Sequence, residues 1–265
     1  MKIKTVRTAA FSMDYIRFGE GEQTLVILPG LSVQSVLGMA EAVKEAYQLL
    51  ADAFTVYLFD RRNELPEVYP IDEMAKDTAE ALYTLGLKDV CLFGTSQGGM
   101  IAQKLAIDHP ELVKKLVLGS SAACVSETAS GIVGEWIEFA KQGKTKELYL
   151  SFGAAVYPKA VFEQSKDLLT EAAETVTEQD LQRFIVLAGG LKDFDVRDEL
   201  KKLTCPVLAI GSKDDAVLGG DAIPQIAECL KEKPDFECYL YEGFGHAAYD
   251  IAPDYKERLL RFFTK

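Results

Sequence analysis

Histidine is scarce in this sequence, which has only two among 265 residues, His109 and His246. Cysteine is also sparse, and the five thiols include no Cys-x-x-Cys pair and no other spacing of a metal site. Zinc needs several such ligands close together, so the sequence predicts no metal site. Reduced thiols, two of them in or beside buried strands, are the simplest interpretation of Cys91, Cys124, Cys205, Cys229 and Cys238.

Positive charge is in deficit, because 29 lysines and arginines stand against 41 acidic residues and leave a net charge of −12. Such a chain lacks the basic surface that follows nucleic-acid phosphates or binds anionic membranes, so neither partner is expected. No apolar run approaches a membrane span, and residues 1–7 lack the apolar run of a signal peptide. We therefore expect a cytoplasmic protein. A glycine-rich dinucleotide fingerprint is also missing after the first predicted strand, so no cofactor is expected.

What the sequence does contain is a serine in a glycine-rich turn, Gly94-Thr95-Ser96-Gln97-Gly98. The apolar residues 90–93 before it predict a buried strand, and residues 100–106 after it predict a helix with one apolar face. Strand, tight turn and helix form the context in which such a turn exposes a nucleophilic serine. The alternative is a structural turn whose serine only caps the helix. The context favours Ser96 as a nucleophile.

A serine nucleophile needs a neutral imidazole to accept its proton, so one of the two histidines must serve. His109 stands at the far end of the helix that follows Ser96, where a solvated, helix-terminal role is the simpler interpretation. His246 follows the strand-like residues 236–240 in a loop with adjacent glycines. Loops after strands commonly carry reactive groups, so we predict His246 as the base. Activity should then fall at acid pH, as this imidazole takes up a proton.

The acid that orients the histidine should follow another strand. The apolar residues 206–210 predict that strand, and Ser212-Lys213-Asp214-Asp215 comes after it. We choose Asp214 as the acid, with its neighbour Asp215 as the rival. Either could instead be an aspartate that forms a turn with its own backbone. The order serine, aspartate, histidine along the chain matches one known arrangement of this chemistry.

These motifs resemble those of the α/β-hydrolase fold family, in its lid-containing group of esterases, lactonases and iminopeptidase-like enzymes. The resemblance covers nearly the whole chain. Residues 25–31 are similar to the family's strand and oxyanion loop, and residues 109–118 and 203–208 to two further family stretches. Pro29 stands where many relatives carry histidine. After Asp60-Arg61, relatives usually continue with a Gly-x-Gly loop, whereas this chain has Arg62-Asn63-Glu64.

The resemblance implies an α/β fold with a mostly parallel, eight-stranded sheet, helices on both faces and an inserted helical lid. The alternation of strand-like and helix-like segments also favours one such parallel sheet. The resemblance further implies that the backbone N–H groups of Leu31 and Gln97 form the oxyanion hole. In this scheme Ser96 attacks an acyl carbonyl, His246 transfers the proton, Asp214 holds the imidazole, and water hydrolyses the acyl-enzyme.

The predicted core comprises residues 1–121 and 198–265, and residues 122–197 form the lid. This middle segment loses the strand–helix alternation and reads as mostly helical, with several aromatic residues at helical spacing. At least half of those aromatics should serve lid packing. Trp136, Phe139 and Phe152 are our candidates for lining an apolar acyl pocket.

The sequence thus predicts a serine hydrolase that needs no cofactor and cleaves a small, mainly apolar carboxylic ester, lactone or thioester. Three alternatives remain open: hydrolysis of N-terminal amides, lyase or perhydrolase chemistry on the same scaffold, and a small-molecule receptor that does not turn its ligand over. The expected partner is a small acyl substrate. The oligomeric state does not follow from the sequence.

Overall fold

The computed structural model describes all 265 residues and contains one eight-stranded sheet in the order β1-β2-β4-β3-β5-β6-β7-β8. The strands are β1 (Lys4–Arg7), β2 (Ser12–Phe18), β3 (Gln23–Leu28), β4 (Phe54–Arg62), β5 (Val90–Thr95), β6 (Val113–Gly119), β7 (Val207–Ser212) and β8 (Phe236–Tyr241). The pairs β1–β2 and β2–β4 are antiparallel, and every other pair is parallel. The predicted sheet, mostly parallel and eight-stranded, is confirmed.

The strands β5 and β7 are buried along their whole length because both faces of the sheet are covered. All six residues of β5 and all six of β7 are buried. Successive side chains point to opposite faces, so Val26 and Leu28 of β3 join one core cluster while Leu25 and Ile27 join the other. The sheet therefore separates two hydrophobic layers.

Each layer is completed by helices. The larger layer packs α3 (Ile71–Thr84), α4 (Gln97–Asp108) and α9 (Ala222–Cys229) on one face of the sheet. The other face carries α1 (Ala40–Ala46), α2 (Gln48–Ala51), α10 (Ala248–Ile251) and α11 (Tyr255–Thr264). Three short 3₁₀ helices, η1 (Val36–Met39), η2 (Pro110–Leu112) and η3 (Leu200–Lys202), connect these elements. None of the helices combines the length and the apolar character that a bilayer span requires.

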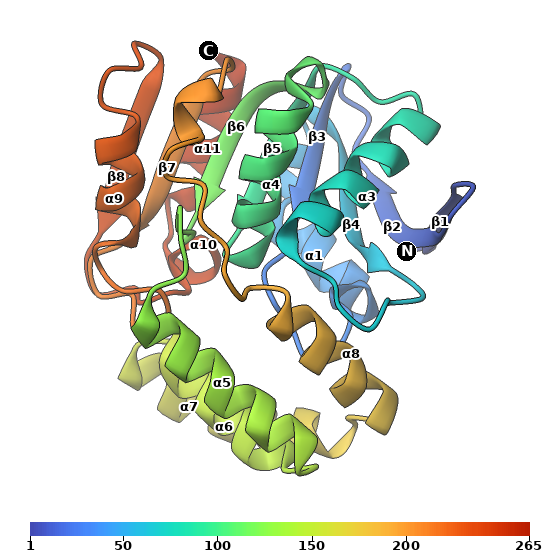
Figure 1. The fold of residues 1–265 in the computed structure, drawn as a ribbon, viewed down its shortest axis with the longest axis vertical. Coiled ribbons are helices and arrows are strands. Elements are labelled where there is room, and N and C mark those ends of the chain that lie inside the picture. The colour runs from blue at the N-terminus through green and yellow to red at the C-terminus, as the bar shows by residue number, and fades with distance from the viewer.

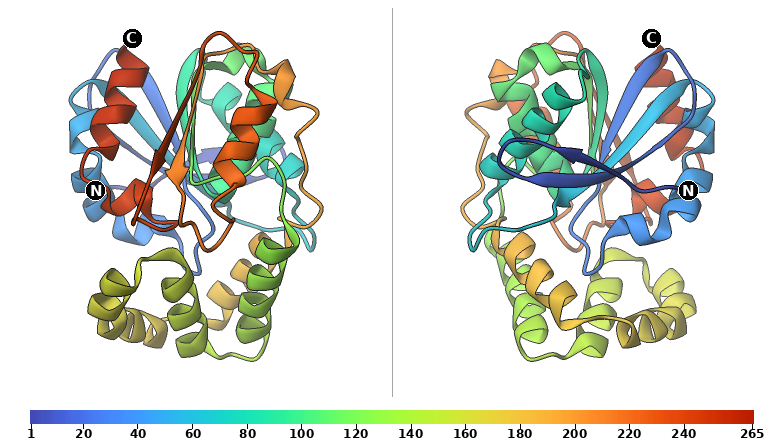
Figure 2. Two further views of the ribbon diagram at one scale, coloured as in Figure 1. Left: turned by 90° about the vertical axis from the view of Figure 1, so that its left-hand side faces the viewer. Right: turned by 90° about the vertical axis from the view of Figure 1, so that its right-hand side faces the viewer.

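Four further helices lie between β6 and β7 in the chain, and we call them the helical insertion. They are α5 (Glu127–Lys141), α6 (Thr145–Val156), α7 (Lys159–Glu174) and α8 (Glu178–Gly189). Side chains start two of them, since Ser126 caps α5 and Thr177 forms a capping box with Asp180 at α8. The insertion packs together below one end of the sheet (Figure 1 and Figure 2). These helices fall within the segment predicted as a lid.

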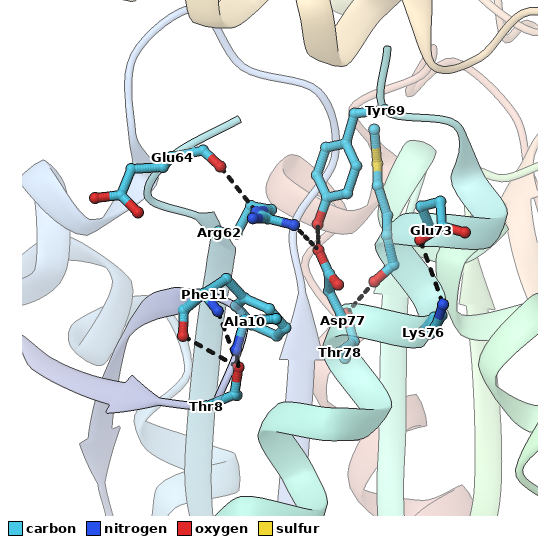
Figure 3. Close-up of polar contacts among 11 residues, drawn as sticks. Thr8, Ala10, Phe11, Arg62, Glu64, Tyr69, Glu73, Lys76, Asp77 and Thr78 are labelled. Carbon is cyan, nitrogen blue, oxygen red and sulfur yellow. Dashed lines mark hydrogen bonds and ion pairs between the residues drawn. The ribbon is translucent and has the colours of Figure 1, made fainter. Parts of the chain in front are cut away.

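The loop after β4, where the sequence departs from the family pattern, is anchored to α3 through Arg62 (Figure 3). Arg62 Nη1 lies 3.4 Å from Asp77 Oδ2, and the Tyr69 hydroxyl donates to the same oxygen at 2.7 Å. Burial raises the pKa of the Asp77 carboxyl, while Tyr69 and Arg62 oppose that shift. Arg62 Nε also donates to the Glu64 carbonyl at 2.8 Å. The loop is thus held by a partly buried ion pair.

Candidate active site

Ser96 occupies a strained turn between β5 and α4. Its φ of 51° and ψ of −121° lie in a region that residues with a side chain rarely adopt. A Cβ at Gly94 would lie 2.3 Å from the Gly98 carbonyl oxygen, and one at Gly98 would lie 2.1 Å from the Leu28 oxygen. The two glycines are therefore required sterically. The turn presents Ser96 to a pocket at the end of the sheet.

His246 lies in the loop between β8 and α10 and lines the same pocket as Ser96. It is 3% exposed, and its Nδ1 lies 2.7 Å from Asp215 Oδ2. The next residue, Ala247, donates its N–H to the Val156 carbonyl of α6, which ties the histidine loop to the helical insertion. Because a carboxylate engages Nδ1, the other ring nitrogen is left for the serine side of the pocket.

His109 stays away from this pocket. It follows α4, and its imidazole contacts the Tyr83 hydroxyl at 3.1 Å and lies 3.8 Å from Glu111 on the protein surface. Of the two histidines, the structure brings only His246 to Ser96.

The acid beside the histidine is Asp215, so the prediction that Asp214 would contact it is wrong. Asp215 is buried, and its Oδ1 accepts the backbone N–H groups of Val217 and Leu218, each at 2.9 Å. These bonds fix the carboxylate and leave Oδ2 facing His246. One oxygen of the carboxylate is therefore held by the backbone, and the other contacts the imidazole.

Asp214 has a different task on the solvent side of the same turn. Its side chain is exposed and accepts hydrogen bonds from Ser212 Oγ at 2.6 Å, from Gly243 N at 2.9 Å and from Gly245 N at 3.1 Å. Partial burial alone would raise its pKa, but these three donors hold the pKa of Asp214 below its ordinary value. Asp214 therefore fixes the backbone of the loop that carries His246.

The spacing of residues in the sequence did not distinguish Asp214 from Asp215. The apolar residues at positions 217 and 218 are the only sequence signal of a buried turn after Asp215.

The predicted oxyanion donors both lie next to Ser96. Leu31 follows β3 and lines the pocket, and a Cβ at the preceding Gly30 would lie 3.1 Å from the Ser96 Cβ. Gln97 is the first residue of α4. The backbone N–H groups of Leu31 and Gln97 have no acceptor within the protein. Two free donors beside a serine can bind the negative oxygen that forms when the serine attacks a carbonyl.

The pocket around Ser96 is apolar, since 12 of its 15 lining residues are hydrophobic. Its free volume is small, about 30 Å³. Trp136 and Phe152 line it as predicted, with ring centroids 4.6 Å apart. Phe139 does not line it; this residue lies about one turn further along α5 than Trp136 and packs half-buried against the core. Sequence reasoning missed the aliphatic lining residues Met100, Val125, Ala129, Val133, Val156, Leu191, Val217 and Leu218, and also missed Tyr249.

A wider groove opens beside this pocket, between the loop after β3 and the helical insertion. Its free volume is about 630 Å³. Phe152 lines both spaces and so stands between them. The groove also carries polar side chains, among them Gln34, Tyr149 and Asp180. The two spaces differ in polarity and in size.

No group of three or more histidine, cysteine, aspartate or glutamate side chains is placed to hold a metal ion. The five cysteines are free. Burial raises the pKa of the Cys91 thiol to about 11, and that of Cys205 also to about 11. A thiol with such a pKa stays protonated at neutral pH, so neither competes with Ser96 as a nucleophile.

Comparison with known proteins gives a consistent result. Residues 23–253 match the family model described as alpha/beta hydrolase fold. A protein of Serratia proteamaculans (strain 568), provisionally named carbamate hydrolase RutD, is 26% identical over 260 residues, covering 89% of each chain. The pimeloyl–acyl-carrier-protein methyl ester esterase of Proteus mirabilis (strain HI4320) is 25% identical over 257 residues, covering 92% of this chain and 93% of the relative.

Among solved structures, MGS-M2, an alpha/beta hydrolase enzyme from a Medee basin deep-sea metagenome library, has a TM-score of 0.87 with this chain. The two are 21% identical, and the match covers 99% of this chain and 98% of that one. This likeness confirms the predicted fold class.

Proposed function

Because the chain belongs to the α/β-hydrolase fold family, we propose that it is a serine hydrolase of small, mainly apolar carboxylic esters, acting through Ser96, His246 and Asp215. The observation that carries this proposal is the buried contact of 2.7 Å between His246 and Asp215, in a loop that shares its pocket with Ser96. An ordered base and acid beside a strained serine have no evident use in a protein that only binds its ligand.

The reaction follows from the positions of these groups. The Ser96 hydroxyl attacks the carbonyl carbon while His246 takes its proton, and Asp215 stabilises the imidazolium that results. The N–H groups of Leu31 and Gln97 bind the oxyanion. His246 then gives the proton to the departing alcohol, and a water molecule activated by the same imidazole releases the acid. Every proton removed is returned, so the enzyme ends each cycle unchanged.

The two spaces beside Ser96 suggest how a substrate is seated. A short acyl group enters the small apolar pocket between Trp136, Met100 and Leu218, where burial of its methyl or methylene groups supplies binding energy. The leaving group extends past Phe152 into the wider, partly polar groove. The helical insertion roofs both parts and acts as the lid. The named activities of the relatives, carbamate and methyl ester hydrolysis, likewise break a bond at a carbonyl carbon.

A lactone or a thioester presents the same carbonyl to the same groups, so these substrates belong to the proposal. The expected partner is a small molecule rather than a macromolecule, because the lining of the pocket is apolar and enclosed.

The test is release of nitrophenol from p-nitrophenyl esters of increasing acyl length. We expect turnover by the native protein with a maximum at a short or medium chain, and none above background with Ser96→Ala. His109→Gln is the matched control, because it removes the only other imidazole and should leave turnover unchanged. Turnover that persists in Ser96→Ala, or that is lost in His109→Gln, would contradict the assignment.

A further inference from the structure

Arg61 lies behind the predicted oxyanion hole and touches both of its halves. It ends the buried part of β4 and is 4% exposed. Its Nη2 donates to the Pro29 carbonyl at 2.8 Å and lies 3.3 Å from the side-chain oxygen of Gln97. One guanidinium nitrogen therefore contacts the loop after β3 and the first residue of α4.

These two contacts matter because of where the oxyanion donors are. The Pro29 carbonyl belongs to the peptide that precedes Gly30, and the flexible glycine alone separates that peptide from the Leu31 N–H. Gln97 carries the second donor on its own backbone. A donor of this kind must lie within a few tenths of an ångström of its productive position, and a supporting group usually ensures that.

The charge of Arg61 is not explained by an ion pair of its own. The carboxylate of the preceding residue, Asp60, pairs with Arg183 of α8 and accepts a hydrogen bond from the Ser35 hydroxyl. Arg61 Nε is buried without a hydrogen-bond partner. Burial lowers the pKa of the Arg61 guanidinium to about 10, which still leaves it charged at neutral pH. A buried cation without an ion pair of its own costs stability, which points to another use.

The helical insertion joins the same network. The Gln97 side-chain nitrogen donates to the Leu187 carbonyl of α8 at 2.6 Å, and Arg183, one turn earlier on α8, pairs with Asp60. Arg61 of β4 thus contacts α4 and the loop after β3, and Gln97 and Asp60 connect this network to α8. These contacts connect the helical insertion to the peptide groups of Leu31 and Gln97, which form the predicted oxyanion hole.

We propose that Arg61 is a positioning residue that aligns both oxyanion donors, the N–H groups of Leu31 and Gln97, through its contacts with the Pro29 carbonyl and the Gln97 side chain. This inference rests on the proposed function. It extends that function by assigning a role to a residue that never touches the substrate.

Arg62 offers a matched control, because it is the next residue, is also an arginine, pairs with Asp77, and makes no contact with Pro29 or Gln97. The experiment compares Arg61→Gln, Arg61→Lys and Arg62→Gln with the native protein. Three quantities are measured: kcat and KM for a p-nitrophenyl ester, the affinity for a trifluoromethyl ketone of the same acyl chain, and the affinity for the carboxylate product. The ketone forms a tetrahedral adduct with serine and reports on the oxyanion hole, whereas the product does not.

For Arg61→Gln we expect kcat to fall about 10- to 100-fold, somewhat less than the loss on removing a whole donor, with KM changed less than about threefold. The ketone affinity should fall in parallel and the product affinity should not. Arg61→Lys keeps the positive charge but lacks the planar guanidinium, so its kcat should lie between those of the native protein and Arg61→Gln. Arg62→Gln should lower Tm and leave kcat within about twofold.

Different results would contradict the proposed function and the positioning role of Arg61. A native protein that neither hydrolyses the ester nor binds the ketone would contradict the proposed function. A native protein that does both, with Arg61→Gln behaving like Arg62→Gln, would overturn the role of Arg61 alone. Should Arg61→Gln fail to fold, Gln97→Met removes the Arg61–Gln97 contact, together with the hydrogen bond to Leu187, and keeps the backbone donor. It should lower kcat and ketone affinity together by about threefold to tenfold, and an unchanged ketone affinity would overturn the role.

Discussion

The pocket has two halves that are built in different ways. Ser96, Asp215 and His246 follow the ends of β5, β7 and β8, and backbone hydrogen bonds or required glycines hold the turns that carry them. The helical insertion supplies Trp136 and Phe152, which are placed by side-chain packing on α5 and α6. Under the proposed function, the strand ends carry the reacting groups, and the insertion supplies part of the wall against which the acyl group packs.

We call the part of the pocket carried by the strand ends the core half and the part carried by the helical insertion the insertion half. The largest effect is expected on removal of the nucleophile from the core half. Ser96→Ala should lower kcat by about 10⁴-fold or more, because loss of a serine nucleophile leaves only binding and the oxyanion hole. Ester turnover measures the effect, and an unchanged Tm shows that the variant is folded. A residual rate within about tenfold of the native rate would mean that the core half does not hold the chemistry.

The two neighbouring aspartates sharpen the comparison within the core half. Asp215→Asn should lower kcat by about 10²- to 10⁴-fold, because an amide cannot stabilise the imidazolium and favours the wrong tautomer. Asp214→Asn should cost less than about tenfold, since this side chain contacts only the hydroxyl of Ser212 and the backbone of the histidine loop. Steady-state kinetics of both variants measure the difference. Equal losses would show that the two carboxylates act as one unit, and a reversed order would restore Asp214 as the acid.

The insertion half should respond in selectivity rather than in chemistry. Phe152→Ala enlarges the passage between pocket and groove, so the preferred acyl or alcohol length should increase while kcat for the best ester changes only about threefold to tenfold. Phe139→Ala is the control, because Phe139 packs outside the pocket. The profile of kcat/KM against chain length measures the effect. A shift in Phe139→Ala equal to that in Phe152→Ala would contradict the assigned lining.

The smallest expected effect concerns acid stability of the histidine loop. The depressed pKa of Asp214 means that its hydrogen bonds stabilise the fold above the unfolded pKa of about 3.9 and that this contribution is lost as pH falls through the lower folded pKa. Because the side chain is exposed, the effect is small. Tm of native protein and Asp214→Asn should differ slightly at pH 5 to 6 and converge once the pH has fallen below the lowered folded pKa of Asp214. A Tm difference between the two proteins that grows as the pH falls would contradict the stabilising role of the ionised Asp214 carboxylate.

The same division explains what the sequence could predict. Ser96 and His246 were recognisable because each follows a strand, and a strand ending in a turn leaves a local signal of glycines and apolar runs. Asp214 and Asp215 share that signal, and only the burial of the turn at Val217 separates them. Phe139 and Phe152 both have helical spacing, so their roles depended on how α5 and α6 pack against the core. Arg61 was out of reach, because its partners come from distant segments of the chain.

The measurement that tests the central claim most directly is labelling of the protein with a small fluorophosphonate, followed by intact mass and peptide mapping. Ser96 activated by His246 and Asp215 should take up one phosphonyl group and release fluoride, with ester turnover lost in proportion to the label. Asp215→Asn should label far more slowly than Asp214→Asn. A protein that hydrolyses esters with no adduct on Ser96, or whose turnover survives full labelling, would contradict the assignment of this site.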